Sequence, residues 1–503
     1  ADTMHKKLFK TLAFISALAC SFSGYTKNFH LEDIQVRSQG SVNPSKLKDI
    51  LKGFIGKNIS ADLLQQIINE VSDYYRENGY PGSLAVIPEQ TISRGILNVE
   101  VLTPHLNRVI IINDRNYLRK SAEERLFYKL KTLEDNALNL DDISSYLLKL
   151  SDLGSFDLKA EFNTDNENYL DNLHINVQPK NKIDFLAFSD NHGTKASGKY
   201  RFGGVIKVNS LTSNADNLSL FYARSSQKQN NYSVTYEFPL NSHPTIVGII
   251  ICLSDYELGK EYAALGAKGT AQTYEMYLKE PVHRSNETKI DFLLGARYRD
   301  LKDEFSNFDL QFNKHSTAAY GTLTFEHKNE RFFLSGFAKA TLGRLYADDD
   351  YNVINDGSFV IGNFGINAGY RFNEVTAVEL RNELQLASTA LEGSEQFLAS
   401  GADAVTAYDP SAVSGDCGAL SSLSLAISPF KNFDLSFKPH LDAAAVKSRN
   451  FKYVDIYGAG LSAELKYHGF FSSLDLSTVI GNKPYKDCDD GQIFFRVGYD
   501  FFN

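Results

Sequence analysis

"IFFRVGYDFFN", residues 493–503, alternates large apolar side chains with small or polar ones. The large apolar positions, each two residues from the next, are Phe495, Val497, Tyr499 and Phe501. The positions between them are Arg496, Gly498 and Asp500. Successive side chains of a β-strand point to opposite faces of the sheet. The segment is therefore expected to be a strand with one apolar face and one polar face.

The same alternation recurs from Ile183 onward, for example in residues 232–238 and 364–372. Over residues 183–503 we count about sixteen such segments of roughly ten residues, as an outer-membrane barrel requires. Such a barrel must be closed, because lipid offers no hydrogen-bond partner to a free strand edge. We therefore predict a transmembrane β-barrel of about sixteen antiparallel strands over residues 183–503.

The connections between these segments fall into two alternating classes. The short ones are 241–243, 328–329, 373 and 468–469. The long ones are 257–270, 301–315, 343–356, 388–416 and 480–489. Short turns on one rim and long loops on the other are typical of outer-membrane barrels. A soluble β-sandwich or a propeller also alternates, but it rarely needs so many strands with aromatic side chains pointing outward.

Two similar units precede the barrel region, at residues 29–103 and 105–179. Each has the pattern of a strand, two helices and two strands, so each predicts a βααββ (α+β) domain. In the first unit, Ser60 is expected to cap the second helix and Gly79 to end it. Arrays of repeated units usually bind or position other chains.

The N-terminal residues resemble an export signal. Three lysines come before the apolar run 11–19, which ends in Ala17-Leu18-Ala19. This predicts a secretory signal peptide over residues 4–19, cleaved before Cys20. The alternatives are a lipid anchor on Cys20 and an apolar helix that is not cleaved.

Composition excludes several classes of protein. The chain has 52 Lys and Arg against 61 Asp and Glu, a formal charge of -9, which argues against a nucleic-acid partner. Four cysteines in 503 residues do not make a disulfide scaffold. No other apolar run approaches the roughly 20 residues of a membrane helix. We find no catalytic constellation, metal motif or cofactor motif, since "GFIGKN" (53–58) has the wrong spacing for a phosphate loop.

Four stretches resemble a known family. They are "YYRENGYPGSLAVIPEQTISRGILNVEV" (74–101), "SDNHGTKASGKYR" (189–201), "LEGSEQFLASGADAVTAYDPSAVSGDCG" (391–418) and "FKPHLDAAAV" (437–446). With the signal peptide, the two repeats and the barrel, they are similar to the two-partner secretion outer-membrane transporters. These are the haemolysin and haemagglutinin secretion-activation proteins, whose repeats are called polypeptide-transport-associated (POTRA) domains.

The resemblance implies a place in the outer membrane of a Gram-negative bacterium, with the repeats in the periplasm. It implies a translocase that captures an unfolded exported protein and conducts it through the barrel to the cell surface. The implied cargo is a large, β-helical exoprotein, and the implied surroundings are lipid and lipopolysaccharide. We expect a monomer without cofactor or enzymatic activity. The alternatives are an assembly factor that inserts barrels and a passive porin.

The resemblance also implies a lock between a loop and the barrel. The family carries Val-Arg-Gly-Tyr/Phe at the tip of its sixth extracellular loop, and this Arg pairs with a strand Asp inside the barrel. Here the tip is 405–408, with Thr406 at the Arg position, so we expect Thr406, Tyr408 and Asp442 to form the lock. Asp442 would lack its cation, and a buried carboxylate must then protonate, hydrate or find another partner. Ala444 stands where the family usually has Gly.

Cargo capture is expected on the first repeat, where an open strand edge suits the addition of a cargo strand. The residues we select are Tyr74, Tyr75, Leu84, Val86 and Ile87. For Tyr74 and Tyr75 the alternative is a place in the core of the repeat.

Three further groups have two readings each. Asp190, Asn191 and Gly193 are expected in the first extracellular hairpin, where Gly and Asn serve tight turns, rather than in a metal or phosphate site. Cys417 and Cys488 both fall on the rim of long loops, where they either form a disulfide or remain two separate thiols. The acidic stretch 346–352 is either a Ca²⁺ loop or a solvated loop tip.

Overall fold

The computed structural model describes residues 30–92, 94–165, 170–259, 266–347, 357–430, 434–449, 452–485 and 487–502. The expected signal peptide, and the acidic stretch from residue 348 on, lie outside these residues. The chain divides into two compact units. One comprises residues 1–107, 133–142 and 164–171, and the other comprises residues 108–132, 143–163 and 172–503.

The first repeat has the expected element order. Its elements are β1 (Asp33–Ser38), α2 (Pro44–Leu51), the short helix η2 (Lys52–Phe54), α3 (Ala61–Glu77), β2 (Leu84–Val86) and β3 (Ile96–Leu102). The three strands form a sheet in the order β1-β3-β2, in which β1 is parallel and β2 antiparallel to β3. β2 is therefore a three-residue strand at an edge of this sheet.

Side chains fix the ends of the elements in this repeat. The Ser60 hydroxyl accepts from the Leu63 amide at 3.1 Å and begins α3, as expected. Gly79, at φ +93°, follows the end of α3. Beyond β2, the Gln90 side chain accepts from the Asn98 amide at 2.9 Å and donates to the Asn98 carbonyl at 2.7 Å. Gln90 thus takes the place of a strand residue beside β3 and shortens the free edge.

The second repeat has the same order. Its elements are β4 (His105–Asn113), the short helix η3 (Asp114–Asn116), α4 (Lys120–Lys131), α5 (Leu140–Ser151), β5 (Phe156–Asp165) and β6 (Leu170–Pro179). The sheet order is β4-β6-β5, which matches the order in the first repeat. Among the described residues, every helix is too short or too polar to cross a membrane.

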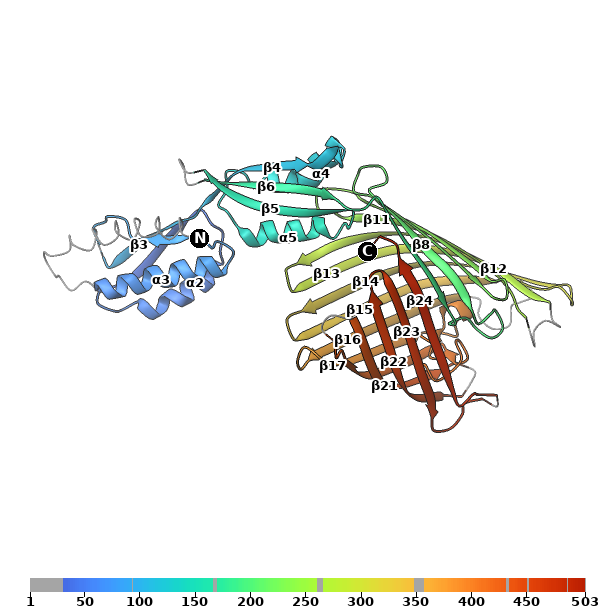
Figure 1. Ribbon diagram of the computed structural model, residues 1–503. Helices are drawn as coiled ribbons and strands as arrows, with labels where there is room; N and C mark the ends of the chain where they lie inside the picture. Colours follow the sequence, from blue (N-terminus) through green and yellow to red (C-terminus); the bar gives the residue numbers. More distant parts are fainter. Residues whose placement is uncertain are drawn as a thin grey trace. The chain divides into compact units, whose positions relative to one another are not determined.

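Within the described residues, sixteen antiparallel strands form a closed barrel, which confirms the predicted fold (Figure 1). Their bounds are β7 Ile183–Asp190, β8 Arg201–Asn209, β9 Asn217–Ser225, β10 Asn230–Pro239, β11 Ile246–Glu257, β12 Ala267–Arg284, β13 Thr288–Phe305, β14 Leu310–Lys328, β15 Phe332–Ala347, β16 Gly357–Arg371, β17 Thr376–Ala387, β20 Cys417–Ile427, β21 Asp434–Lys447, β22 Val454–Tyr467, β23 Phe470–Ile480 and β24 Gly491–Asp500. The last strand, β24, pairs with β7 and closes the barrel.

The strands are less uniform than the sequence indicates. They run from 8 residues in β7 to 19 in β14. The long loop expected at 301–315 is instead a hairpin, because β13 and β14 pair as far as Phe305 and Leu310. The backbone ladder continues here, but the charged residues Lys302, Asp303 and Glu304 interrupt the apolar alternation. The alternation that marks a strand is therefore lost from the sequence although the strand persists.

The two faces of the barrel wall differ as expected. Large apolar side chains point outward, and among them Leu294 is 53% and Met276 is 56% exposed. Glu275 and Arg297 belong to the opposite, lumen-facing set, because their neighbours along each strand point outward. This is the arrangement that places lipid outside and a polar lumen inside.

In the second unit, the second repeat is joined to the barrel by polar contacts. The guanidinium of Arg284, 3% exposed at the end of β12, pairs with Asp152 after α5 and with Asp291 at 2.6 Å. The Asn217 amide donates to the Leu153 carbonyl at 2.7 Å. A buried guanidinium held by two carboxylates sets the register between the repeat and this rim of the barrel.

Candidate functional site

The connection between β17 and β20, residues 388–416, folds into the barrel, and we call it the lumen loop. It contains the short helix η6 (Gly393–Glu395) and a two-residue hairpin of β18 (Phe397–Leu398) and β19 (Ser414–Gly415). Its far end turns at Gly401, where φ is +121° and an added Cβ would lie 3.0 Å from the Pro410 Cα. The loop thus has internal structure, which limits how many ways its tip can point.

The tip of the lumen loop packs tightly against the wall. Val405 and Ala407 are fully buried, and Tyr408 is 1% exposed and donates its hydroxyl to the Tyr457 carbonyl at 3.1 Å. Gly458, on β22, makes this close approach feasible, because a Cβ there would lie 2.8 Å from the Ala407 Cβ. The tip therefore fits a surface that a larger residue at Gly458 would close.

Thr406 and Asp442 are brought together as expected. The Thr406 hydroxyl lies 3.2 Å from Asp442 Oδ2 and 2.7 Å from the Ser477 hydroxyl, and it can donate its single proton to either oxygen. Asp442 also accepts from the Ser422 hydroxyl at 2.6 Å and contacts His440 Nδ1 at 3.1 Å. Of the three fates foreseen for this carboxylate, the structure contains the third, another partner.

Sequence reasoning missed His440 as that partner. It precedes Asp442 by two residues, which places both side chains on the same face of β21. That spacing was the available signal, but it does not show that the imidazole also reaches Asp475 on β23, where Nε2 lies 2.9 Å from Oδ2.

A second set of ion pairs ties the start of the lumen loop to the far wall. Glu395 pairs with Arg297, and with Arg299 at 3.2 Å, both on β13. Glu392 pairs with Lys314 of β14 at 3.2 Å, and this ammonium is 4% exposed. The loop is thus attached to β13 and β14 at one end and to β21, β22 and β23 at its tip.

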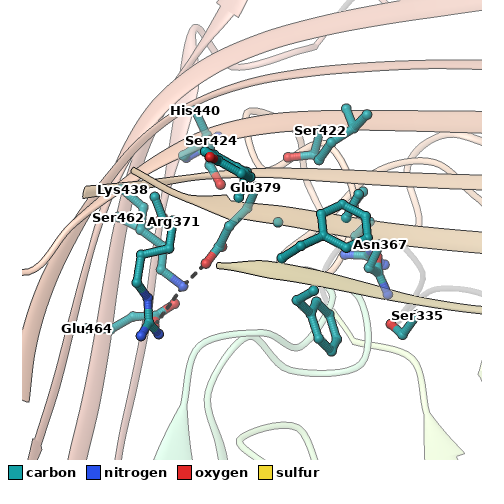
Figure 2. A pocket seen from close by; sticks show the side chains of 18 of the residues that line it. Ser335, Asn367, Arg371, Glu379, Ser422, Ser424, Lys438, His440, Ser462 and Glu464 are labelled. Atoms are coloured by element: carbon teal, nitrogen blue, oxygen red, sulfur yellow. Dashed lines mark ion pairs between the residues drawn. The ribbon is translucent and has the colours of Figure 1, made fainter. Parts of the chain in front are cut away.

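Below the tip lies a cavity of about 680 Å³ whose lining includes Thr406, Asp442 and His440. Figure 2 shows Lys438 between Glu379 and Glu464 on its wall, with Nζ to Oε2 distances of 3.6 and 3.1 Å. Further basic residues on the lining are Arg331, Arg371 and Arg381. The cavity is therefore polar and carries both signs of charge.

The residues of the first hairpin act at the seam of the barrel. Asp190, fully buried, accepts from Arg201 at 2.8 and 2.9 Å and pairs with Arg496 of β24 at 2.9 Å. The Asn191 side chain accepts from the Phe495 amide at 2.8 Å and donates to a β24 carbonyl at 2.7 Å. Asn191 thus lies in the bend after β7, and its side chain also fastens the hairpin to β24, a role that the expected tight turn did not include.

Gly193 and Gly198 do serve the turn of this hairpin. Gly198 has φ +106°, and a Cβ on Gly193 would lie 1.9 Å from the Gly198 carbonyl oxygen. On the outer side, Lys195 pairs with Asp409 of the lumen loop at 2.7 Å and with Asp489 at 2.8 Å. The hydrogen bonds to these carboxylates raise the pKa of Lys195, so it stays charged.

The selection of Tyr74 and Tyr75 for cargo capture is wrong. Both rings belong to the core of the first repeat, at 7% and 3% exposure, and the Tyr74 hydroxyl donates to the Asn43 carbonyl at 3.0 Å. Burial raises the pKa of the Tyr75 phenol. Their helical spacing is compatible with a core face as well as with a binding face. In the structure both rings pack into the core of the first repeat.

Leu84, Val86 and Ile87 are half-buried. Leu84 and Val86 lie on β2, on the face opposite the buried Ala85, and Leu84 is in register with Leu102, which is 52% exposed. Ile87 packs against the core instead.

The two cysteines of the long-loop rim are separate thiols, so the disulfide alternative is wrong. Cys417 Sγ lies against Ala387, where it accepts from the amide at 3.3 Å. Cys488 is buried among the apolar residues around Tyr408. Within the described residues, no group of three or more His, Cys, Asp or Glu is arranged to hold a metal ion.

Comparison with known proteins agrees with this architecture. The family model of haemolysin secretion/activation proteins ShlB/FhaC/HecB matches residues 171–467, and the model of the ShlB-type POTRA domain matches residues 29–103. The heme/hemopexin transporter protein HuxB of Haemophilus influenzae is 22% identical over 403 residues, 78% of this chain and 71% of HuxB. The outer membrane transporter CdiB of Dickeya dadantii is 20% identical over 411 residues, with the same coverage.

The structure of CdiB from Escherichia coli superposes with a TM-score of 0.81 at 18% identity, over 96% of this chain and 92% of that one. At this identity the likeness concerns the fold, and the family model adds the sequence evidence over more than half of the chain. The protein therefore belongs to the ShlB/FhaC/HecB family of haemolysin secretion/activation proteins, the outer-membrane transporters of two-partner secretion.

Proposed function

We propose that this outer-membrane transporter captures an unfolded exported protein in the periplasm and conducts it through the barrel lumen. The main support for this proposal is the cavity below the lumen loop. Its lining carries both signs of charge, with Lys438 between Glu379 and Glu464, so a moving chain can exchange hydrogen bonds with it. The tip of the lumen loop, with Thr406 and Tyr408, covers this path at rest, and its contact with Asp442 is the lock.

Cargo capture is assigned to the outer face of the first repeat's sheet. Leu84, Val86 and Leu102 offer apolar side chains there, beside the free edge of β2. The Ala85 amide already donates to the Ser72 hydroxyl at 2.9 Å, which limits the main-chain bonds that a cargo strand could gain. Apolar contact therefore carries more of the affinity than strand addition does.

The cargo we propose is a large exoprotein that folds as a β-helix at the cell surface. The periplasm holds no ATP, so folding outside supplies the direction of transport. We assign residues 29–103 and 105–179 to two periplasmic domains and residues 183–503 to the barrel, which acts as a monomer. The outward apolar side chains suit contact with lipid and lipopolysaccharide.

The deciding experiment compares secreted and outer-membrane proteomes with and without this protein. Loss of one large extracellular protein, with other barrels unchanged and restored by complementation, is the expected result. A general fall in barrel proteins would instead indicate an assembly factor. No change in either fraction would indicate a passive porin or an inactive relative.

A matched variant tests the capture surface. Leu84→Asp combined with Leu102→Asp places charge on the apolar face without opening the core, since Leu102 is exposed. Export of the cargo should fall severalfold while the amount of transporter in the membrane stays constant. Glu100→Gln, in register with Val86 on the same face, is the control and should leave export unchanged. Equal export from all three would remove this face from the proposal.

A further inference from the structure

The polar contacts at the loop tip close into a ring of five side chains. Asp442 Oδ2 contacts His440 Nδ1 at 3.1 Å, and His440 Nε2 contacts Asp475 Oδ2 at 2.9 Å. Asp475 Oδ1 accepts from the Ser477 hydroxyl, whose oxygen lies 2.7 Å from the Thr406 hydroxyl. Thr406 returns to Asp442 Oδ2 at 3.2 Å. Four members belong to β21 and β23, and the lumen loop supplies only Thr406.

The wall carries its own charge compensation. Asp442 is 5% exposed, and the Asp475 side chain is 14% exposed. Among the described residues, no Lys or Arg forms an ion pair with either carboxylate, while His440 contacts both. An ionised carboxylate can only accept, so an imidazole between two of them donates from both nitrogens, which only the imidazolium form can do. Removing this cation would leave two buried carboxylates uncompensated.

Neighbouring residues hold the imidazole in this position. The imidazole of His440 reaches across β22, from β21 to β23, above Gly460, where a Cβ would lie 2.5 Å from His440 Nε2. The Ser422 hydroxyl donates to Asp442 at 2.6 Å, and the Ser462 hydroxyl donates to Asp475. The nearest other charged cluster on the wall is Lys438 with Glu379 and Glu464, which pair with one another. The site is therefore assembled by the barrel before the loop arrives.

We propose that His440 is a positioning residue that supplies, from the barrel wall, the cation of the loop lock. This inference rests on the function proposed above. It means that the lock can open at a small cost in free energy. When Thr406 leaves, Asp442 keeps its imidazolium partner, and only neutral hydroxyl contacts are lost. An ion pair carried by the loop itself would leave a buried carboxylate unpaired at each opening. Because the barrel wall supplies the cation and the loop supplies only a hydroxyl, less free energy is needed to release the tip.

The test measures the conductance of the full-length protein in planar bilayers. Barrel folding is checked by the change in electrophoretic mobility that a folded barrel shows when the sample is heated, which we call the band shift. Thr406→Val removes the hydroxyl at constant shape and should raise the open probability about tenfold or more, as expected for one hydrogen bond to a charged carboxylate. His440→Gln removes the cation and should raise it further. His243→Gln, in the exposed turn between β10 and β11, is the control and should behave as wild type.

The decisive variant combines His440→Gln with Thr406→Arg. An arginine at the tip can pair with Asp442, so the combination should return the open probability toward that of the wild type. A merely structural role for His440 predicts no such rescue. If His440→Gln alone conducts like the wild type while folding normally, or if Thr406→Arg does not rescue it, the proposal is wrong. Conductance needs no cargo, so this result is independent of whether export is observed.

Discussion

At the scale of single residues, the lock depends on close approach as much as on charge. Val405 and Ala407 lie against Gly458, where a Cβ would come within 2.8 Å of the Ala407 Cβ. Protein interiors are packed too densely to absorb such an overlap without movement. Because the strand is held by the barrel ladder on both sides, the loop tip is the part that can yield.

Gly458→Val should therefore displace the tip and leave the barrel intact. We expect higher conductance and greater sensitivity of cells to large antibiotics that the outer membrane normally excludes. Gly321→Ala on β14 is the matched control, because a Cβ there meets only Phe292 at 3.9 Å. If both variants behave alike, close packing at Gly458 does not hold the loop.

Asp190 holds two guanidinium groups where β7, β8 and β24 meet. Asp190→Asn should lower the stability of the barrel by about 3 kcal/mol, the low end for a broken buried ion pair, because both arginines are part-exposed. The temperature at which the heated barrel loses its band shift measures this. Asp500→Asn, also at the seam but forming only an exposed contact with Phe502, should change it little. An equal shift for both would contradict the role given to Asp190.

At the scale of elements, α5 and the residues after it bind the second repeat to the barrel. The Tyr146 hydroxyl lies within hydrogen-bond distance of two carbonyl oxygens, that of Leu126 at 2.6 Å and that of Ser242 in the β10–β11 turn, and it can donate to either. Burial raises the pKa of this phenol, so it remains a donor. Together with Asp152 and Arg284, it attaches residues 143–163 of the repeat to the barrel within one compact unit.

Asp152→Asn should loosen this attachment, because Arg284 would then keep only Asp291 as a charged partner. Hydrogen exchange should become faster in α5 and in the turns at residues 240–245 and 285–287. The barrel strands should exchange as before. Asp157→Asn on β5, whose pair with Lys180 is exposed, is the control. Unchanged exchange in α5 would show that apolar contacts alone hold the repeat.

At the scale of the whole molecule, closure of the barrel and occupation of its lumen are separate. Sixteen strands pair around the described wall, and β24 meets β7 without any residue of the lumen loop in the ladder. The loop adds contacts to the inside of a wall that is already complete. On the function proposed above, transport would require movement of the loop, while the barrel could stay closed.

Replacing residues 399–412 by a short Gly-Ser turn should leave the barrel folded and its lumen open. The band shift on heating should be retained, and conductance should rise to a steady open level. The same replacement of the 306–309 turn between β13 and β14 is the control and should leave the conductance at rest unchanged. Failure of the shortened protein to assemble would show that the lumen loop is needed for closure.

The barrel and the repeats followed from local patterns. Period-two alternation, as in residues 493–500, arises because lipid and lumen face each strand from opposite sides, so each strand records its environment independently. Helical spacing, with Leu63, Ile67 and Val71 on one face, marked α3 for the same reason. Near residues 301–315, where charged side chains interrupt the alternation, the pattern is lost although β13 and β14 continue.

By itself, the sequence determined the barrel and the βααββ repeats, and its resemblance to the family implied the meeting of Thr406 with Asp442. Only the tertiary structure decided that Tyr74 and Tyr75 are core, that Asn191 fastens the seam, and that His440 compensates Asp442. The physical reason is the range of the interactions. Periodicity is set by the environment of one segment, whereas a ring that joins Asp475, His440 and the loop depends on contacts across three strands that no local pattern records.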